Sequence, residues 1–362
     1  MPNKADIRAE AARILSGFEN AGAAPVDTDL LLPASTLLDL YGEDIRARAY
    51  TVSDPVRGEL MLRPDFTVPV VQMHMANGAD PARYAYAGEV FRRQEDLSGR
   101  ANEYIQVGYE VFDRTDPAAA DAEVFALISA QLAPMGLHPT TGDIGILIAA
   151  VQGLRCSENR RNALMRHLWR PRRFRALLER FGGRTPMPAR RADLLSQADP
   201  FDQSGPDNGL RSRAEVAARL DALRADAAED PIGAGEVDLI EDILTLRETC
   251  DNALSQLRDF AVDMPAIAQA VDGLGRRLNA MANRGIDISS LDFEATFGRS
   301  NMEYYDGFVF GFHAPGRPDL PPIATGGRYD ALTRVLGEGR EIPAVGAVIR
   351  PGLILELQEA RS

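Results

Sequence analysis

The spacing of apolar residues predicts helices at the N-terminus and through the middle of the chain. In 4–20 apolar side chains recur every three or four positions, which is typical of a helix with one buried face. Shorter helices are expected at 35–40 and 69–76, and a longer one at 117–132. The span 151–284 is mostly helical in pattern, with breaks at its proline- and glycine-rich stretches.

Alternating apolar and polar residues predict strands near both ends of the chain. The expected strands are 48–52, 59–63, 83–92, 103–112, 142–148, 292–297, 304–312 and 345–349. Because strands flank a helical block, the pattern predicts an α+β fold interrupted by a helical insertion. We assign 1–151 and 286–362 to the core and 152–285 to the insertion.

One predicted strand, 103–112, carries candidate chemistry on its polar face. Side chains alternate across a strand, so Gln106, Gly108 and Glu110 share one face and apolar residues share the other. The glycine between two polar groups predicts an open floor flanked by an amide and a carboxylate, which suits an amino group of a small ligand. A solvent-facing strand would be equally polar, and the pattern alone leaves both interpretations open.

The neighbouring predicted strands show a similar asymmetry. In 83–92 the guanidinium of Arg92 lies beyond a gap made by Gly88, and arginine suits two-point binding of a carboxylate or phosphate. A surface position is the commoner use of any single arginine. In 304–312 alternate phenylalanines predict a core face. Glycines occupy the other face together with Tyr305, and they permit close approach of a ligand or of backbone.

The distribution of charge limits the classes of partner. The net charge of −13 argues against a general nucleic-acid surface, because phosphate binding needs clustered cations. However, 155–191 holds twelve arginines and two glutamates, and 215–259 holds twelve acidic residues and four arginines. The two blocks either complement each other within one domain, or form a docking surface for another protein, or bind RNA through the basic block.

Cysteine, histidine and hydropathy patterns point to a reduced, metal-free protein. Cys156 and Cys250 fit a reducing cytoplasm and have no metal-ligand spacing, so we expect a cytoplasmic location. The histidines are scattered and predict no ligand cluster: His74, His138, His167 and His313. No run of about 18 apolar residues and no secretory signal is present, so neither a membrane span nor export is expected.

Several ordered segments resemble histidyl-tRNA synthetases of class II. The matching segments are Leu-Arg-Pro-Asp-Phe-Thr at 62–67, Phe-Arg-Arg at 91–93, Gln-Val-Gly-Tyr-Glu at 106–110, Glu-Tyr-Tyr at 303–305, Gly-Gly-Arg-Tyr-Asp at 326–330 and the third class II motif at 343–357. They cover 40–112 and 292–355 in the family's order. The resemblance implies a six- or seven-stranded, mainly antiparallel sheet flanked by helices, and a homodimer with 31–33 at its two-fold interface.

The resemblance also implies a histidine pocket. Carried over position by position, its residues are Asp65, Thr67, Arg92, Gln106, Glu110, Tyr305 and Tyr329. The groups that would surround the amino group are Asp65, Thr67, Gln106 and Glu110. Tyr305 and Tyr329 would lie near the imidazole, and Arg92 would hold the carboxylate. Asp65 replaces a glutamate of the family, so its reach is one methylene shorter.

The ATP side of the site departs from the family. The arginine that lies over the ATP adenine falls on Leu353, and a second catalytic arginine falls on Ser300, with Arg299 one place away. Losing one positioned electrostatic group commonly costs about 10²–10³ in rate, so two losses predict very weak adenylation. Arg350 is near but precedes Pro351 at the strand end. The chain also stops where an anticodon-binding domain would begin.

These departures resemble the regulatory subunits of ATP phosphoribosyltransferase, which are synthetase-like and do not aminoacylate. That resemblance implies a non-catalytic protein without a cofactor, required with a short catalytic subunit for the first step of histidine biosynthesis and for feedback by histidine. Two alternatives remain: a truncated ligase that adenylates an amino acid, and an amino-acid sensor that binds RNA through 155–191.

Overall fold

A long twisted sheet organises the molecule. The computed structural model describes residues 2–41, 43–94, 100–201, 209–299 and 304–361. Within these residues, nine strands form one sheet in the order β1 (Ala24–Pro25), β5 (Ala82–Phe91), β6 (Glu103–Phe112), β12 (Ala344–Ile349), β11 (Ala324–Arg328), β10 (Phe308–His313), β7 (His138–Asp143), β9 (Asp292–Glu294) and β8 (Arg247–Thr249). A second sheet has the order β2 (Leu31–Pro33), β4 (Gly58–Leu62) and β3 (Thr51–Asp54).

The large sheet is mainly antiparallel. Only the pairs β1–β5 and β7–β9 run parallel among the described strands. At the centre of the sheet, Gly346 of β12 lies opposite Glu110 of β6 on one side and opposite Gly327 of β11 on the other. The predicted α+β class and the mainly antiparallel sheet are confirmed. The strand number of six or seven that the resemblance implied is wrong, because the short strands β1, β8 and β9 extend the described sheet at its edges.

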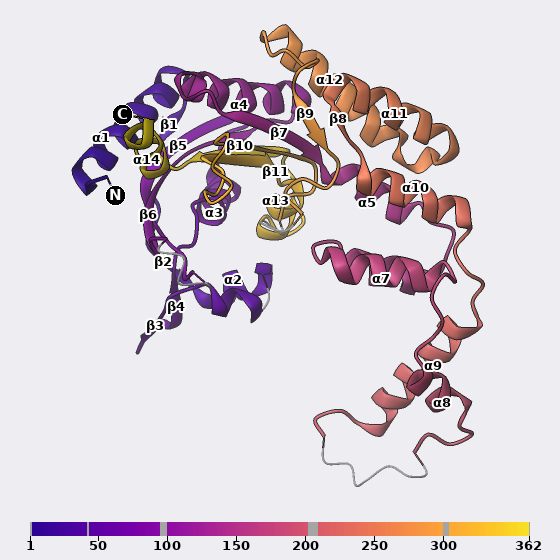
Figure 1. The fold of residues 1–362 in the computed structure, drawn as a ribbon. Coiled ribbons are helices and arrows are strands. Elements are labelled where there is room, and N and C mark those ends of the chain that lie inside the picture. The colour runs from indigo at the N-terminus through magenta and orange to yellow at the C-terminus, as the bar shows by residue number, and fades with distance from the viewer. Residues whose placement is uncertain (1, 42, 95–99, 202–208, 300–303, 362) are drawn as a thin grey trace.

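Helices cover both faces of this sheet (Figure 1). The helices are α1 (Lys4–Asn20), α2 (Ala34–Tyr41), α3 (Thr67–Asn77), α4 (Pro117–Leu132), α5 (Ile144–Gln152), α6 (Glu158–Arg166), α7 (Pro171–Phe181), α8 (Ala189–Ser196), α9 (Arg213–Ala228), α10 (Ala234–Thr245), α11 (Cys250–Asp263), α12 (Ala268–Asn283), α13 (Asp330–Leu336) and α14 (Pro351–Arg361), with short 3-10 turns η1 (Glu43–Ala47), η2 (Ala133–Met135) and η3 (Pro265–Ile267). Helices α1 and α4 lie on one face, and α3 and α13 lie on the other.

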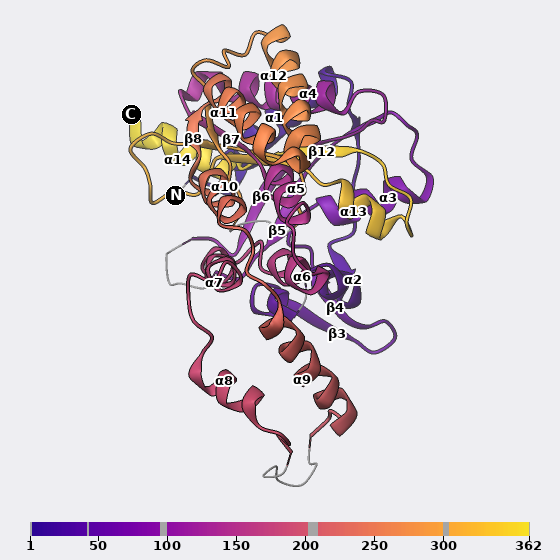
Figure 2. The same cartoon turned by 90° about the vertical axis from the view of Figure 1, so that its right-hand side faces the viewer.

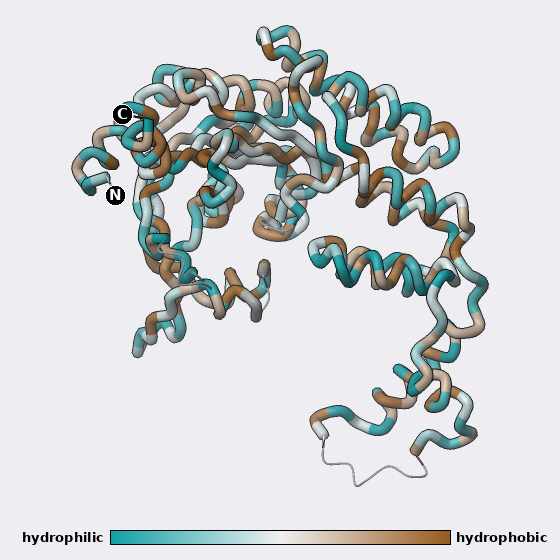
Figure 3. Tube along the Cα trace, in the orientation of Figure 1, coloured by the Kyte–Doolittle hydropathy of each residue, from teal (hydrophilic) through white to brown (hydrophobic). Residues whose placement is uncertain are grey.

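Alternation along the strands divides the core in two. Val107, Tyr109 and Val111 point into the larger cluster with α1 and α4, while Tyr86 and Val90 of β5 belong to the smaller cluster beneath α3. Hydrophobic positions, brown in Figure 3, gather along the central strands, and α11 and α12 alternate brown and teal as expected of helices with one buried face. The face that holds the smaller cluster also holds the candidate site.

Local hydrogen bonds set the helix starts. The Asn3 side chain accepts the Asp6 amide at 2.9 Å at the start of α1, and Asp116 accepts the Ala119 amide at 3.0 Å at the start of α4. These two helices begin and end as the sequence pattern predicts. Such caps use residues whose side chains compete for backbone amides, which is why the pattern and the structure agree there.

Two predicted strands are wrong in part. The strand expected at 142–148 ends at Asp143, whose carboxylate accepts the Gly145 amide at 2.9 Å and starts α5. That helix is apolar on most sides because it is buried, so its sequence does not show a helical period. The strand expected at 304–312 begins at Phe308, which leaves Tyr305 in the preceding turn.

The segment predicted as an insertion has two differently placed parts. Helices α6 to α9 extend away from the sheet, as Figures 1 and 2 show, whereas β8 pairs with β9 inside the sheet. The strand β8 belongs to a span that we expected to be mostly helical. Helix α12 packs against α4 and so lies on the core.

The basic and acidic blocks pair with each other. Arg160 contacts Asp226 at 2.9 Å and Glu229 at 3.3 Å, and Arg191 also contacts Asp226, at 2.7 Å. Arg184 makes an ion pair with Glu241 at 2.9 Å. The interpretation that the blocks complement each other within the chain is confirmed for these pairs.

Candidate functional site

One pocket on the α3 side of the sheet collects every residue that the sequence predicts for the site. Its lining consists of Asp65, Thr67, Arg92, Gln106, Glu110, Tyr304, Tyr305, Tyr329, Gly346, Ala347, Val348 and Arg350. The space among them is about 290 Å³, part of it open solvent. Residues from six segments of the chain therefore meet around the floor made by β6 and β12.

Glu110 is the centre of the pocket. Its side chain is 1% exposed and accepts hydrogen bonds from the hydroxyls of Tyr86 at 2.8 Å, Thr67 at 3.3 Å and Tyr329 at 2.5 Å. On the adjacent strand, a β-carbon on Gly346 would lie 1.4 Å from the Glu110 Oε2. The carboxylate can occupy this place only because its neighbour in register is glycine.

The pKa of Glu110 places the change in charge of the pocket near neutral pH. Burial raises the pKa of Glu110 to about 7, the three hydroxyls oppose that rise, and nearby Asp65 adds to it. Asp65 also lies 3.6 Å from the Arg92 guanidinium, as an ion pair inside the pocket. A cationic group placed beside these two carboxyl groups would lower the pKa of Glu110 and be held by both.

Gln106 is the side chain of the site that most directly indicates a bound ligand or water. Its amide is fully buried, and neither Oε1 nor Nε2 has a hydrogen-bond partner among the described residues. A buried polar group left without a partner costs about 1–3 kcal/mol, so it is retained where a ligand or water completes it. The amide lines the pocket, next to the carboxylate on the same strand face.

Two arginines form the opposite, cationic side. The Arg92 Nε donates to the Pro64 carbonyl at 2.7 Å, and the Arg350 Nη1 donates to the Pro322 carbonyl at 2.7 Å. Burial lowers the pKa of Arg350. The sequence analysis placed Arg350 at the strand end without a role; its spacing of two and four residues from Val348 and Gly346 on one strand face is the signal that could have found it.

Aromatic rings close the remaining side. The Tyr304 and Tyr305 rings pack edge to face with centroids 4.8 Å apart, and Tyr304 lies 6.2 Å from the Tyr329 ring. A β-carbon on Gly327 would come within 2.8 Å of the Tyr305 ring. The Gly-Gly-Arg-Tyr-Asp segment therefore supplies Tyr329 to the pocket, and its Gly327 leaves the space that the Tyr305 ring occupies. Tyr304 was missed because only one of the tyrosine pair was carried over.

The predicted open floor at the glycines is wrong. A β-carbon on Gly108 would lie 2.1 Å from the Tyr86 ring, and one on Gly88 would lie 2.7 Å from the Arg63 guanidinium. The glycines thus admit side chains of the protein itself rather than a ligand. Tyr86 uses that room to stack on Phe66, with ring centroids 4.2 Å apart, and to reach Glu110 with its hydroxyl.

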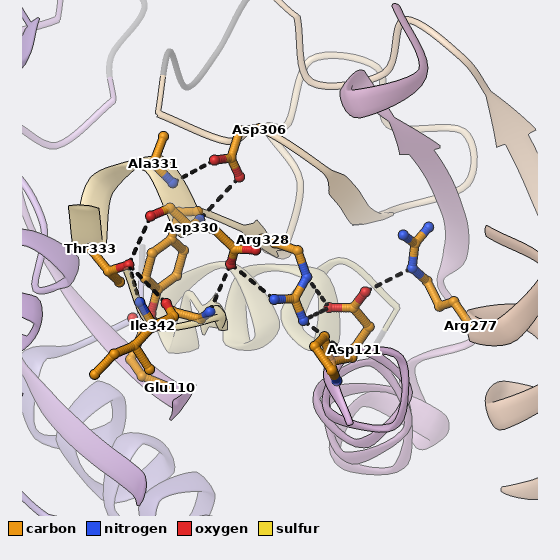
Figure 4. A network of polar contacts seen from close by, with 12 residues as sticks. Glu110, Asp121, Arg277, Asp306, Arg328, Asp330, Ala331, Thr333 and Ile342 are labelled. Carbon is orange, nitrogen blue, oxygen red and sulfur yellow. Dashed lines mark hydrogen bonds and ion pairs between the residues drawn. The ribbon is translucent and has the colours of Figure 1, made fainter. Parts of the chain in front are cut away.

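A buried network of ion pairs holds the pocket tyrosine in place (Figure 4). Arg328 precedes Tyr329 and donates to Asp121 of α4 at 2.7 Å and to Asp330 at 2.9 Å. Asp121 in turn accepts from Arg277 of α12 at 2.8 Å. Asp121, Arg277 and Arg328 are buried, so the network ties the end of β11 to two helices on the opposite face of the sheet.

Leu353 and Arg299 lie outside this pocket. The Leu353 side chain is half-buried against the larger core cluster, and Arg299 donates to the Leu168 carbonyl beside α7. Ser300 lies outside the described residues. Across the described ranges, no three His, Cys, Asp or Glu side chains come together as metal ligands, and no helix is long and apolar enough to cross a membrane.

Comparisons with known proteins point to one family. A family model described as histidyl-tRNA synthetase matches residues 1–234 and 214–351. A protein of Brucella anthropi and one of Brucella canis, both named ATP phosphoribosyltransferase regulatory subunit, are 34% and 32% identical to the chain, and each match covers 89% of both sequences.

Solved structures share the fold. An ATP phosphoribosyltransferase regulatory subunit/histidyl-tRNA synthetase from Bacillus halodurans superimposes with a TM-score of 0.68 at 20% identity, covering 99% of this chain and 81% of that one. A histidine–tRNA ligase subunit from Alicyclobacillus acidocaldarius gives a TM-score of 0.61 at 25% identity, covering 100% and 95%. The class II synthetase-like fold is confirmed, and the chain belongs to the histidyl-tRNA synthetase-like family of ATP phosphoribosyltransferase regulatory subunits.

Proposed function

We propose that this chain is the cytoplasmic, non-catalytic partner of a short-form ATP phosphoribosyltransferase catalytic subunit, and that it binds histidine in the Glu110 pocket as an effector. The family names favour the regulatory function over the truncated-ligase alternative. The observation that carries the histidine site is Gln106, a fully buried amide whose two polar atoms lack partners among the described residues. A zwitterionic amino acid would supply both a donor and an acceptor there.

The charges of the pocket match those of an amino acid. The α-ammonium would lie between Glu110 and Asp65, and the carboxylate would lie toward Arg92 and Arg350. Asp65 and Arg92 now contact each other at 3.6 Å, so each would exchange its present partner for one end of the ligand. The tyrosine rings of the pocket would contact the imidazole.

The ATP side of the site supports the proposed lack of adenylation activity. The side chain of Leu353 packs on the core and offers no charge, and Arg299 turns toward α7 instead of the pocket. Transition-state charge on an α-phosphate would therefore lack two positioned cations. The absence of ATP–pyrophosphate exchange in the purified chain is the expected result.

The small sheet supports the proposed homodimer. Leu30, Val52 and Val56 are among the exposed large hydrophobic residues, at 45%, 40% and 92% exposure. They lie in or beside β2 and β3, where the family resemblance places a two-fold interface. Sedimentation of Val52→Asp should give a monomer if this surface forms the dimer.

Reconstitution with the partner tests the regulatory function. The purified chain is mixed with a short-form catalytic subunit from the same genome, and phosphoribosyl transfer is measured with and without it. We expect transfer to rise when the chain is added. Unchanged transfer despite formation of a stable complex would contradict the proposal, and calorimetry with histidine then tests the pocket separately.

A further inference from the structure

A second cavity, separate from the Glu110 pocket, lies where α7 meets α10 and the edge of the large sheet. It has about 730 Å³ of empty space, part of it open solvent. Three arginines line it, Arg175, Arg247 and Arg299, together with two threonines and two apolar residues. No carboxylate is among the lining residues, although the histidine pocket has two.

Arg299 is the unexplained group of this cavity. It is 5% exposed, and its Nη2 has no hydrogen-bond partner among the described residues. Its Nε donates to the Leu168 carbonyl and its guanidinium lies 4.6 Å from the centroid of the Phe174 ring. Neither contact neutralises the charge, and no ion pair to it is seen in the described part of the chain. A buried, unpaired cation is costly, which favours an anion at this place.

The surroundings add positive rather than negative potential. Burial and the neighbouring charge of Arg175 lower the pKa of Arg299 to about 10. The pKa of His167 is also lowered, by burial and then by the charges of Arg170, Arg173 and Arg166. Arg247 is the exception, because it is paired with Glu294 at 2.7 Å. Arg175 and Arg299 are therefore the two lining cations for which the described residues provide no ion-pair partner.

The start of α7 faces the same cavity. Pro171 and Arg175 of its first turns line the cavity, and Arg170 at the cap position makes no side-chain hydrogen bond to the helix amides. Helix α7 lies below α10 in Figures 1 and 2. An uncapped helix N-terminus carries a partial positive charge and free N–H donors, which favour phosphate.

We propose that this cavity binds a small phosphate-bearing molecule, with Arg175 and Arg299 holding the phosphate group. Two guanidinium groups without counter-charges match a dianion, and arginine contacts phosphate by two parallel hydrogen bonds. The chain's net charge of −13 favours a small ligand over an RNA backbone. The proposal does not depend on the histidine pocket.

A matched pair of variants on α7 tests it. Arg175→Gln and Arg173→Gln each remove one exposed arginine from the same helix, but only Arg175 lines the cavity. Binding of inorganic phosphate and of pyrophosphate is followed by thermal unfolding and calorimetry at constant ionic strength, with chloride as the reference salt. We expect at least about tenfold weaker binding in Arg175→Gln and less than twofold change in Arg173→Gln.

Hydrogen exchange locates the anion. Phosphate should slow exchange in 168–176 and leave β6 unchanged if the proposal is right. Slowed exchange in β6 instead would place the anion in the Glu110 pocket and overturn it. Equal weakening in both variants would indicate diffuse attraction, and tight binding of an RNA oligonucleotide without phosphate binding would indicate a nucleic-acid surface; either result also overturns the proposal. So would the absence of any phosphate-dependent shift.

Discussion

At the scale of single residues, the pocket depends on a carboxyl group whose charge is finely balanced. Glu110 is buried and raised in pKa to about 7, and it remains near ionisation only because three hydroxyls donate to it. Gln106 lies four residues earlier on the same face of β6, and its amide has no hydrogen-bond partner among the described residues. Under the proposed function, both side chains would gain a partner from the bound amino acid.

Histidine binding should release a proton from Glu110 near neutral pH. The ligand's ammonium would lower the raised pKa, so a fraction of the carboxyl groups protonated at pH 6.5 would ionise on binding. Calorimetry in buffers of different ionisation enthalpy measures the protons released. Glu110→Gln should bind histidine more weakly and lose this part of the release; release that is unchanged in the variant would assign it to the imidazole alone.

The same carboxyl group should make stability depend on pH. Its pKa is about 7 in the folded state and ordinary when unfolded, so the folded protein holds more protons and stability falls as pH rises from about 4.5 to 7. The cost is up to about 3 kcal/mol above pH 7. Urea unfolding of Glu110→Gln against the parent should show their difference growing in the variant's favour across that window. A constant difference would contradict this. Burial also raises the pKa of Asp306 to about 7, but that group is present in both proteins and cancels in the comparison.

At the scale of elements, close strand packing allows the site to form. Gly346 and Gly327 lie opposite each other on β12 and β11, where the first admits Glu110 and the second admits Tyr305. Behind them, Arg328 connects the end of β11 to α4 and α12 through Asp121. The glycines and the ion network are therefore structural requirements of one pocket wall.

Gly346→Ala should remove histidine binding. The added carbon would overlap the Glu110 carboxyl oxygen at 1.4 Å, so the carboxyl group must leave its three hydroxyl donors. We expect a loss of about 1–3 kcal/mol in unfolding free energy, measured in urea. Gly235→Ala in α10 is the control, because no atom lies within 4 Å of its added carbon and it should stabilise by about 0.5–1 kcal/mol. Equal effects would contradict the packing argument.

Breaking the network should cost far more than breaking a surface pair. Asp121→Asn leaves Arg277 and Arg328 buried with half of their partners, which predicts a loss of about 3–5 kcal/mol. Arg317→Gln removes solvent-facing ion pairs with Asp319 and Glu356 and should cost far less. Thermal and urea unfolding compare the two. A loss in Asp121→Asn as small as in the control would show that the network contributes little to stability.

At the scale of the whole molecule, a synthetase-like sheet carries an outlying arm, α6 to α9, whose opposite charges are paired internally. The Glu110 pocket and the arm are on one chain, and under the proposed function the partner enzyme would respond to the occupancy of the pocket. Such a signal requires the complex to have two states that differ in histidine affinity.

Histidine inhibition of the assembled enzyme should depend on the pocket. With a partner catalytic subunit, the histidine concentration for half-inhibition should rise at least about tenfold when Glu110→Gln is used, since a charge-assisted contact is lost. The ratio of transfer rates with and without histidine is the measurement. Lys4→Gln, which removes an exposed pair with Glu103, is the control. Unaltered inhibition with Glu110→Gln would place the effector site elsewhere.

Local sequence patterns predicted the α+β class and the helices with local caps and apolar faces, and motifs and alternation identified seven pocket residues. Those features depend on neighbours a few residues apart, so the amino-acid sequence is sufficient to predict them. The start of α5 at Asp143 and the late start of β10 were missed, because burial removes the period that marks a helix and turn residues can continue a strand pattern.

Three features are visible only in the folded structure. They are the side chains that fill the space beside the glycines, the arginines that face each cavity, and the protonation of Glu110 in the pocket. Gly108 was expected to leave room for a ligand and instead admits Tyr86, and Arg350 joins the pocket while Arg299 lines a second one. Each outcome depends on atoms brought together from segments more than a hundred residues apart or from separate strands. Burial, clearance and pKa are properties of that three-dimensional neighbourhood, and no spacing along the chain specifies them.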